Sequence, residues 1–128
     1  MPTYPTPGIA PPIFYNLAAC PIRNGAAVVL KKWPALVVCH LSFGTHRFSE
    51  LAGGLPDISQ RMLTKTLREL ERDGFVSRTV TASVPPRVDY DLTDLGRSLL
   101  PSLQSVLQWG ARNMAAVKSN REAAGDTR

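Results

Sequence analysis

The stretch 58–92 constrains the fold of this chain most, because it predicts a helix followed directly by a β-hairpin. Ser59 is a favourable helix N-cap, and Gly74 suits the left-handed residue that ends many helices. Two segments rich in β-branched residues come next, and two prolines stand near the end of the loop that separates them. The predicted elements are therefore a helix over 59–73, strands over 75–81 and 87–92, and a connecting turn over 82–86.

Length and composition restrict the class of protein. The 128 residues predict one domain, and a hydrophobic fraction of 44% is ordinary for a globular protein. The formal net charge of +5 favours a polyanionic partner such as nucleic acid, with simple solubility as the alternative explanation. Since we find neither a long apolar run nor a secretory signal, we expect no membrane span and a cytoplasmic location.

Proline content and helical periodicity divide the chain into an arm, a domain and a tail. Residues 1–19 carry five prolines and no charged side chain, which predicts an irregular N-terminal arm. The domain is predicted over 20–118 and a flexible polar tail over 119–128. Further helices are predicted over 21–31, 34–41, 47–53 and 94–118. The helix 34–41 is apolar on nearly every side and should lie in the middle of the core, and Pro101 should kink the last helix.

The predicted helix over 59–73 has two chemically distinct faces. At about 100° per residue, the side expected to face the core carries Leu63, Thr66, Leu67 and Leu70. The opposite side carries three cations and no acid, and consists of Gln60, Arg61, Thr64, Lys65 and Arg68. We expect Glu69 and Glu71 to point elsewhere. Arginine and glutamine can read guanine and adenine edges in the major groove of DNA, and lysine and threonine can hold phosphates. A solvated face that contacts nothing is the alternative, and the helix alone favours neither.

The hairpin behind this helix favours DNA binding. Pro85 and Pro86 stiffen its tip, and Arg87 follows at once. A rigid loop that ends in arginine suits a narrow, electronegative minor groove. A plain turn with a surface arginine is the alternative, but a basic helix, a cap glycine and a hairpin in series are typical of a winged helix that meets DNA.

Seven short motifs follow one another along the chain: Cys20-Pro21, Lys32-Trp33, RFSEL over 47–51, ISQRMLT over 58–64, LRELERDG over 67–74, VPPRVDY over 84–90 and LTDLGRSL over 92–99. In this order they resemble the HxlR-type winged-helix transcriptional regulators, a family related to the MarR group. The match covers roughly residues 20–112. It implies a mostly helical α+β fold, namely a winged helix-turn-helix with a two-stranded hairpin wing and a long C-terminal dimerisation helix. It also implies a homodimer that binds repeats in promoters.

These observations predict a dimeric transcriptional regulator rather than an enzyme. The recognition helix 59–73 and the wing 82–87 are expected to contact double-stranded DNA through Ser59, Gln60, Arg61, Thr64, Lys65, Arg68, Arg87 and Arg47. An apolar stripe on the last helix independently fits a dimer interface made by Leu100, Leu103, Leu107, Met114 and Val117. The alternative is that this stripe covers the core of its own chain. No glycine-rich phosphate loop, nucleophile elbow or carboxylate pair stands out, so no cofactor is expected.

The two cysteines raise a narrower hypothesis about the signal. Some HxlR-type proteins resemble thiol sensors that respond to oxidants or electrophiles through a cysteine in a Cys-Pro pair. In this sequence Cys20 occupies that position. A helix N-terminus increases the thiolate character of a cysteine, and an inert packed cysteine is the alternative. Cys39 should be a small core residue. His40 and His46 with Cys39 lack a fourth ligand, so no metal site is expected.

Two other functions stay open from the sequence. One is a winged-helix regulator that responds to a small molecule without thiol sensing. The other is a protein-interaction module in which the winged helix docks another protein.

Overall fold

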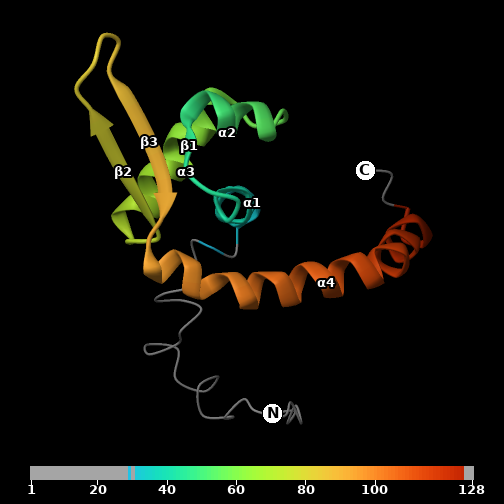
Figure 1. Ribbon diagram of the computed structural model, residues 1–128. Coiled ribbons are helices and arrows are strands. Elements are labelled where there is room, and N and C mark those ends of the chain that lie inside the picture. The colour runs from blue at the N-terminus through green and yellow to red at the C-terminus, as the bar shows by residue number, and fades with distance from the viewer. Residues whose placement is uncertain (1–28, 30, 126–128) are drawn as a thin grey trace, which may run out of the picture.

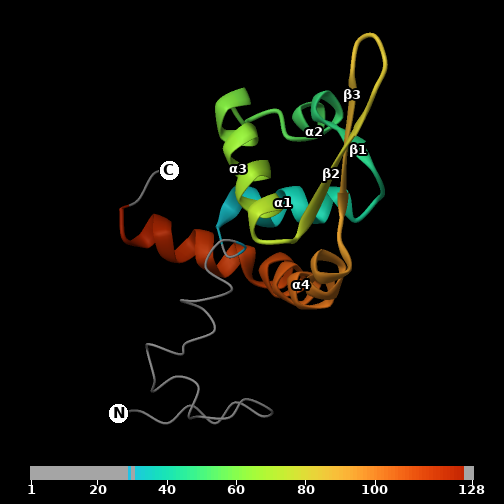
Figure 2. The ribbon, with the colours of Figure 1, turned by 90° about the vertical axis from the view of Figure 1, so that its left-hand side faces the viewer.

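The computed structural model describes Val29 and residues 31–125, which form four α-helices and a three-stranded antiparallel sheet. In chain order the elements are α1 (Lys32–Leu41), β1 (His46–Arg47), α2 (Phe48–Gly54), α3 (Gln60–Arg72), β2 (Val76–Thr81), β3 (Arg87–Leu92) and α4 (Asp94–Ala123). Figures 1 and 2 show β2 and β3 as a hairpin that projects beside α3, with α4 across the opposite side of the molecule. The predicted fold class is confirmed. The predicted arm 1–19, Cys20 and most of the helix predicted over 21–31 lie outside the described residues.

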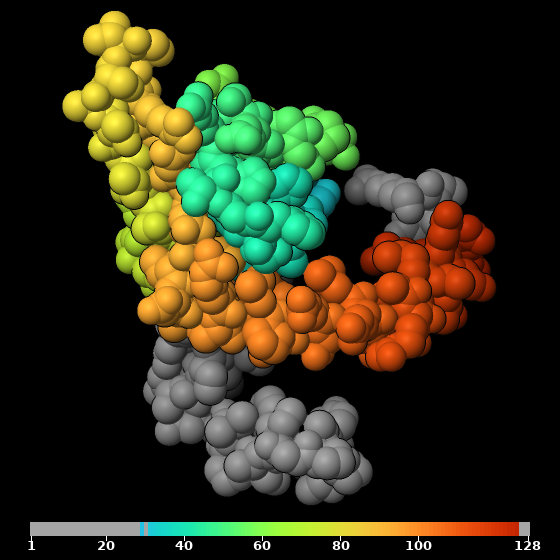
Figure 3. Space-filling model, viewed as in Figure 1, coloured from blue at the N-terminus to red at the C-terminus, as the bar shows by residue number. Residues whose placement is uncertain are grey.

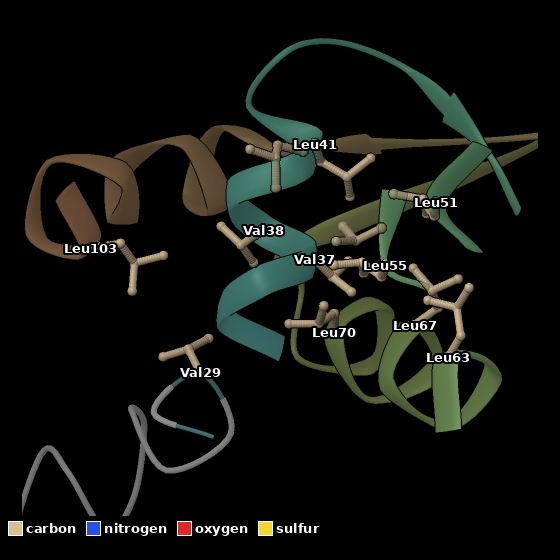
Figure 4. Close-up of a cluster of buried hydrophobic side chains, with 12 residues drawn as sticks. Val29, Val37, Val38, Leu41, Leu51, Leu55, Leu63, Leu67, Leu70 and Leu103 are labelled. Atoms are coloured by element: carbon tan, nitrogen blue, oxygen red, sulfur yellow. The ribbon is translucent and has the colours of Figure 1, made fainter. Parts of the chain in front are cut away.

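The helix α1 lies at the centre of the core, as its all-round apolar sequence predicts. Val37, Val38 and Leu41 are fully buried, and α1 contacts α2, α3, α4 and β3. Figure 4 shows α1 between Leu103 of α4 on one side and the leucines of α3 on the other. The helix begins at Lys32, slightly earlier than predicted, because a proline is tolerated within the first turn, where amides lack helical partners.

The short strand β1 is not predicted by the sequence. It pairs with β3, with His46 opposite Tyr90 and Arg47 opposite Asp89. The helix α2 begins just after it, and the Glu50 carboxylate accepts a hydrogen bond from the backbone nitrogen of Arg47 at 2.9 Å. Two residues are too few to show an alternating pattern, so only the tertiary pairing reveals that the predicted hairpin gains a third strand.

The helix α3 has the predicted caps and the predicted buried face. The Ser59 hydroxyl oxygen accepts a hydrogen bond from the Met62 backbone nitrogen at 3.0 Å. Gly74 follows the helix with a φ of 85°, a left-handed conformation that favours glycine. The side chains predicted to face the core are buried, namely Leu63, Thr66, Leu67 and Leu70.

The register of the hairpin decides which residues face α3. Directly paired residues point to the same face of a sheet. The face turned toward α3, called the inner face, carries the pairs Val76–Leu92, Arg78–Tyr90 and Val80–Val88. At the base of the hairpin Val76 and Leu92 are buried, whereas Val80 further out is 52% exposed. Only the base of the hairpin is therefore part of the core, and its tip projects into solvent (Figure 1). The whole hairpin β2–β3 is called the wing.

A compact junction joins α3, the sheet and α4. The Thr93 hydroxyl donates to the Gly74 carbonyl at 2.5 Å and accepts from the Gly96 backbone nitrogen at 3.1 Å. The Thr93 backbone nitrogen donates to the Phe75 carbonyl at 3.1 Å. Gly96 is buried so closely against this junction that an added Cβ would overlap the carbonyl oxygen of Phe75.

The helix α4 is longer than predicted. Its predicted cap, Thr93, is confirmed, and the helix continues through Pro101, which removes one backbone donor without ending it. The kink predicted there stays a prediction. The segment 119–123, predicted to be part of a flexible tail, is helical up to Ala123, because polar residues such as Arg121 are good helix formers on an exposed helix. No helix among residues 31–125, α4 included, combines the length and apolarity needed to cross a bilayer.

The apolar stripe of α4 splits between two environments. Leu103 is only 9% exposed, and Leu100 packs against the core of its own chain. Further along, Leu107 is 52% and Met114 is 60% exposed, and Val117 is half-buried. Figure 3 shows the second half of α4, coloured orange to red, extending away from the core. The first half therefore covers the core of its own chain, which was the alternative interpretation, while the second half leaves apolar side chains open.

We predict that Gly96→Ala lowers the free energy of unfolding by about 1–3 kcal/mol, because the new methyl group must displace backbone at the junction. Replacing a helical glycine by alanine normally stabilises a helix by about 1 kcal/mol. The matched control is Gly53→Ala in α2, where nothing lies within 4 Å of the added Cβ. Chemical denaturation would measure both variants, and equal effects would contradict the close packing of Gly96.

Candidate nucleic-acid interface

The exposed face of α3 borders a wide hollow of about 1100 Å³. All six residues predicted to act from this helix line it, together with three others: Ser59, Gln60, Arg61, Thr64, Lys65 and Arg68, with Met62, Glu69 and Arg72. The prediction that Glu69 points away from this face is wrong. It stands four residues after Lys65, so the two side chains lie on the same side of the helix.

Three cations on this face have no acidic partner in the described part of the chain. No ion pair within 4.0 Å between described residues involves Arg61, Lys65 or Arg68. Arg72, by contrast, is paired with Asp73 at 3.0 Å, and its hydrogen bond lowers the pKa of the Asp73 carboxyl. Three cations without ion pairs outnumber the one acid on this face, Glu69, and such an excess of positive charge favours a polyanionic ligand over a small neutral one.

The two hydroxyl groups predicted on this face differ in what they can offer. The Ser59 oxygen accepts the capping hydrogen bond, so its own hydrogen stays available to a ligand. The Thr64 hydroxyl donates to the Gln60 carbonyl at 2.9 Å. Thr64 has therefore already used its donor, and in this rotamer it presents a lone pair and a methyl group rather than a phosphate donor.

Arg87 lies at the start of β3 and is held by an acid on the same strand. Its Nε atom is 3.0 Å from the Asp89 carboxylate, and the Arg87 side chain is 51% exposed. Residues two apart on a strand share a face, so Arg87 lies on the outer face of the hairpin, away from α3. An exposed pair of this kind contributes about 0–1 kcal/mol, so a stronger anion can take the guanidinium from Asp89.

Arg47 lies beside Arg87 rather than beside α3. It ends β1, is exposed, and stands directly opposite Asp89 in the sheet. The strand register therefore puts Arg47 and Arg87 on the same outer face of the sheet as Asp89. The predicted DNA-contacting residues form two groups, one on α3 and one on the outer face of the sheet.

Arg78 lies next to the cationic face of α3, and it was not identified from the sequence as a candidate DNA-contacting residue. It projects from the inner face of β2, and with Tyr90 of β3 it lines a second hollow of about 340 Å³ against Thr64 and Arg68 of α3. Its signal in the sequence was the alternation Val76, Arg78, Val80, which puts a cation where an apolar residue is expected. Without the register of the strands, that cation cannot be assigned to the face beside α3.

The described cysteine and the histidines show no sign of a metal centre. Among residues 31–125, no group of three or more His, Cys, Asp or Glu side chains could hold a metal ion. The rings of His40 and His46 pack with their centroids 5.3 Å apart. Cys39 is half-buried, and burial raises the pKa of its thiol, which fits the small core residue that was predicted. Cys20 lies outside the described residues.

Comparison with known proteins agrees with this geometry. Residues 28–118 match the family described as HxlR-like helix-turn-helix. The HTH-type transcriptional regulator YybR of Bacillus subtilis is 41% identical over 109 residues, which is 85% of this chain and 87% of YybR. The redox regulator HypR in its reduced form superposes with a TM-score of 0.73 and 41% identity, over 77% of this chain and 98% of HypR. The reduced form of the transcriptional regulator YodB of B. subtilis superposes with a TM-score of 0.64 and 36% identity, over 71% of this chain and 90% of YodB.

These matches decide the class of the protein. The relatives are helix-turn-helix transcriptional regulators, which confirms the predictions that the chain is such a regulator and that it is not an enzyme. The family match also covers α1 to α4 almost completely, so it includes both the cationic face of α3 and the hairpin. The chain belongs to the HxlR-like helix-turn-helix family of winged-helix transcriptional regulators.

Proposed function

We propose that this regulator recognises operator DNA in a promoter by inserting α3 into the major groove. The observation that carries the proposal is the exposed face of α3, where Arg61, Lys65 and Arg68 stand without acidic partners among the described residues. Arg61 and Gln60 lie in the first turns, next to the helix N-terminus that usually meets base edges in helix-turn-helix proteins. Ser59 and Lys65 are suited to the flanking phosphates.

The wing makes the second contact in this proposal. Arg87 leaves Asp89 and binds the minor groove or its phosphates, and Arg47 holds the backbone at the edge of the site. Because the Arg87–Asp89 pair is exposed and weak, the exchange of a carboxylate for a phosphate costs little. Asp89 then keeps Arg87 in an extended, ready position while no DNA is bound.

We further propose that the protein acts as a homodimer through the second half of α4. Leu107 and Met114 are exposed there, four and eleven residues after Leu103, so the seven residues between Leu107 and Met114 match the repeat of helices that pack along a common seam. The half-buried Val117 lies on the same side of the helix, and Leu100 supports it from the core side. A two-fold axis through α4 would leave both copies of α3 on the opposite side, about 34 Å apart on successive turns of DNA.

The signal is proposed to be an oxidant or electrophile that reacts with Cys20. HypR is described as a redox regulator, and YodB has been studied after treatment with diamide. Burial raises the pKa of the Cys39 thiol and so lowers its thiolate fraction, which makes Cys39 a poor candidate for the reacting group; the Cys-Pro position of Cys20 in the sequence favours that residue instead. A small-molecule effector that does not react with thiols is the alternative.

The variant Arg61→Ala with Lys65→Ala should abolish binding to a duplex selected by the wild-type protein from random DNA, because two of the three cations of the face are removed. Fluorescence anisotropy would measure binding as a function of salt. The matched control is Lys118→Ala with Arg121→Ala, which removes two cations from α4 and should leave binding unchanged. Unaltered binding by the α3 variant would contradict the assignment. Interaction of the wild type with proteins but not with any duplex would favour the protein-docking alternative.

The variant Leu107→Glu with Met114→Glu should be monomeric at concentrations at which the wild type is dimeric, because two carboxylates would be placed on each side of an apolar seam. Light scattering after size exclusion would give the mass of both proteins. Leu95→Glu is the control, since Leu95 is 53% exposed in the first turn of α4, where an acid is favourable. A monomeric wild type, or a dimeric double variant, would rule out this interface.

Cys20→Ser should bind the selected duplex with the affinity of the wild type but lose its response to diamide. Cys39→Ser should retain that response, because the half-buried thiol with a raised pKa is not the reacting group. Anisotropy before and after diamide, and again after dithiothreitol, would compare the three proteins. If Cys20→Ser responds like the wild type, Cys20 is a structural residue.

A further inference from the structure

Two arginines from different elements line one hollow between α3 and the hairpin. Arg68 comes from α3 and Arg78 from β2, and the hollow of about 340 Å³ is lined by them together with Thr64, Leu67, Glu71 and Tyr90. Among residues 31–125, neither arginine makes an ion pair within 4.0 Å, although Glu71 lines the same space. Two cationic residues thus line one hollow, and neither is neutralised by an ion pair with the acid that borders it, Glu71.

The backbone fixes Arg78 in this position. It stands directly opposite Tyr90, on the inner face whose next residue toward the base, Val76, is buried in the core. Because Val76 anchors the strand, Arg78 cannot turn to the outer face without a shift of register, which would expose Val76 and Leu92. Arg78 and Tyr90 line one hollow with Thr64 and Arg68, so the inner face of the hairpin is the one turned toward α3; Figure 2 shows α3 and the hairpin rising from their common connection near the start of β2.

The hollow continues the proposed DNA surface. Thr64 and Arg68 line both this hollow and the larger one along α3. A continuous path therefore runs from Ser59 at the start of α3, along its cationic face, to Arg78 on the wing. Only an extended polyanion can use the whole path, and a nucleic-acid backbone carries a negative charge at every nucleotide.

We propose that Arg68 and Arg78 together hold one backbone phosphate of the operator, at the edge of the groove that α3 enters. This inference rests on the proposed function, and it changes the role of Arg68 from reading bases to positioning the backbone. A guanidinium group can bind phosphate through two parallel hydrogen bonds, and two such groups on separate elements fix the angle between α3 and the wing. Glu71, on the border of the hollow, weakens this phosphate contact by its charge.

The test measures affinity and salt dependence of Arg78→Gln by anisotropy, with the duplex selected by the wild type and with a shuffled duplex of the same length. Loss of a phosphate contact should weaken both complexes by a similar factor, about tenfold, and should reduce the slope of log affinity against log salt by about 0.9. Arg121→Gln, which removes one cation from the last turn of α4, should change neither. Glu71→Gln should tighten binding to both duplexes.

A double-mutant cycle tests whether both arginines hold the same phosphate. If they do, Arg68→Gln with Arg78→Gln weakens binding by less than the product of the two single effects. Unfolding midpoints equal to that of the wild type would show that the exposed arginines are not needed for folding. An unchanged affinity of Arg78→Gln, a loss confined to the selected duplex, or fully additive effects would each overturn the proposal while leaving the role of α3 intact. A wild type that binds neither duplex would overturn the proposed function, and this inference with it.

Discussion

The burial of α1 is the constraint on which the rest of the molecule depends. A ten-residue helix with apolar side chains on most of its sides is not stable in solvent, so other elements must pack against it. The helix α3 packs on one side of α1 and α4 on another, and α2 and β3 also contact it. Each helix that packs on α1 does so with its apolar side, and its opposite side is therefore exposed to solvent.

That division of faces separates the surfaces of the protein by chemistry. The helix α3 turns cations outward and lies next to the wing, while α4 on the opposite side turns apolar residues outward along its second half. Unpaired cations suit a polyanion, and exposed leucine and methionine suit another apolar surface. In the proposed function, DNA on α3 and a second copy of the chain on α4 would therefore occupy separate surfaces.

Features that follow from local chemistry could be predicted from the sequence. Ser59 and Gly74 mark the ends of α3 by their capping preferences, and the periodicity of the leucines gives its buried face. Features that depend on tertiary pairing could not be predicted in this way. The strand β1 exists only because β3 lies beside it, and Arg78 is assigned to the α3 side only by the register of the hairpin. Side-chain partners such as Asp89 for Arg87 require the position of both residues in the sheet.

The junction around Thr93 has a mechanical consequence. Thr93, which directly follows β3, makes hydrogen bonds to Gly74, Phe75 and Gly96. These bonds connect the end of α3, the residue before β2 and the first turn of α4. No flexible linker stands between the outward-facing half of α4 and the hairpin. A tilt of the first turn of α4 would therefore move the base of the hairpin with it, and a small angle at that base corresponds to a larger displacement at the tip.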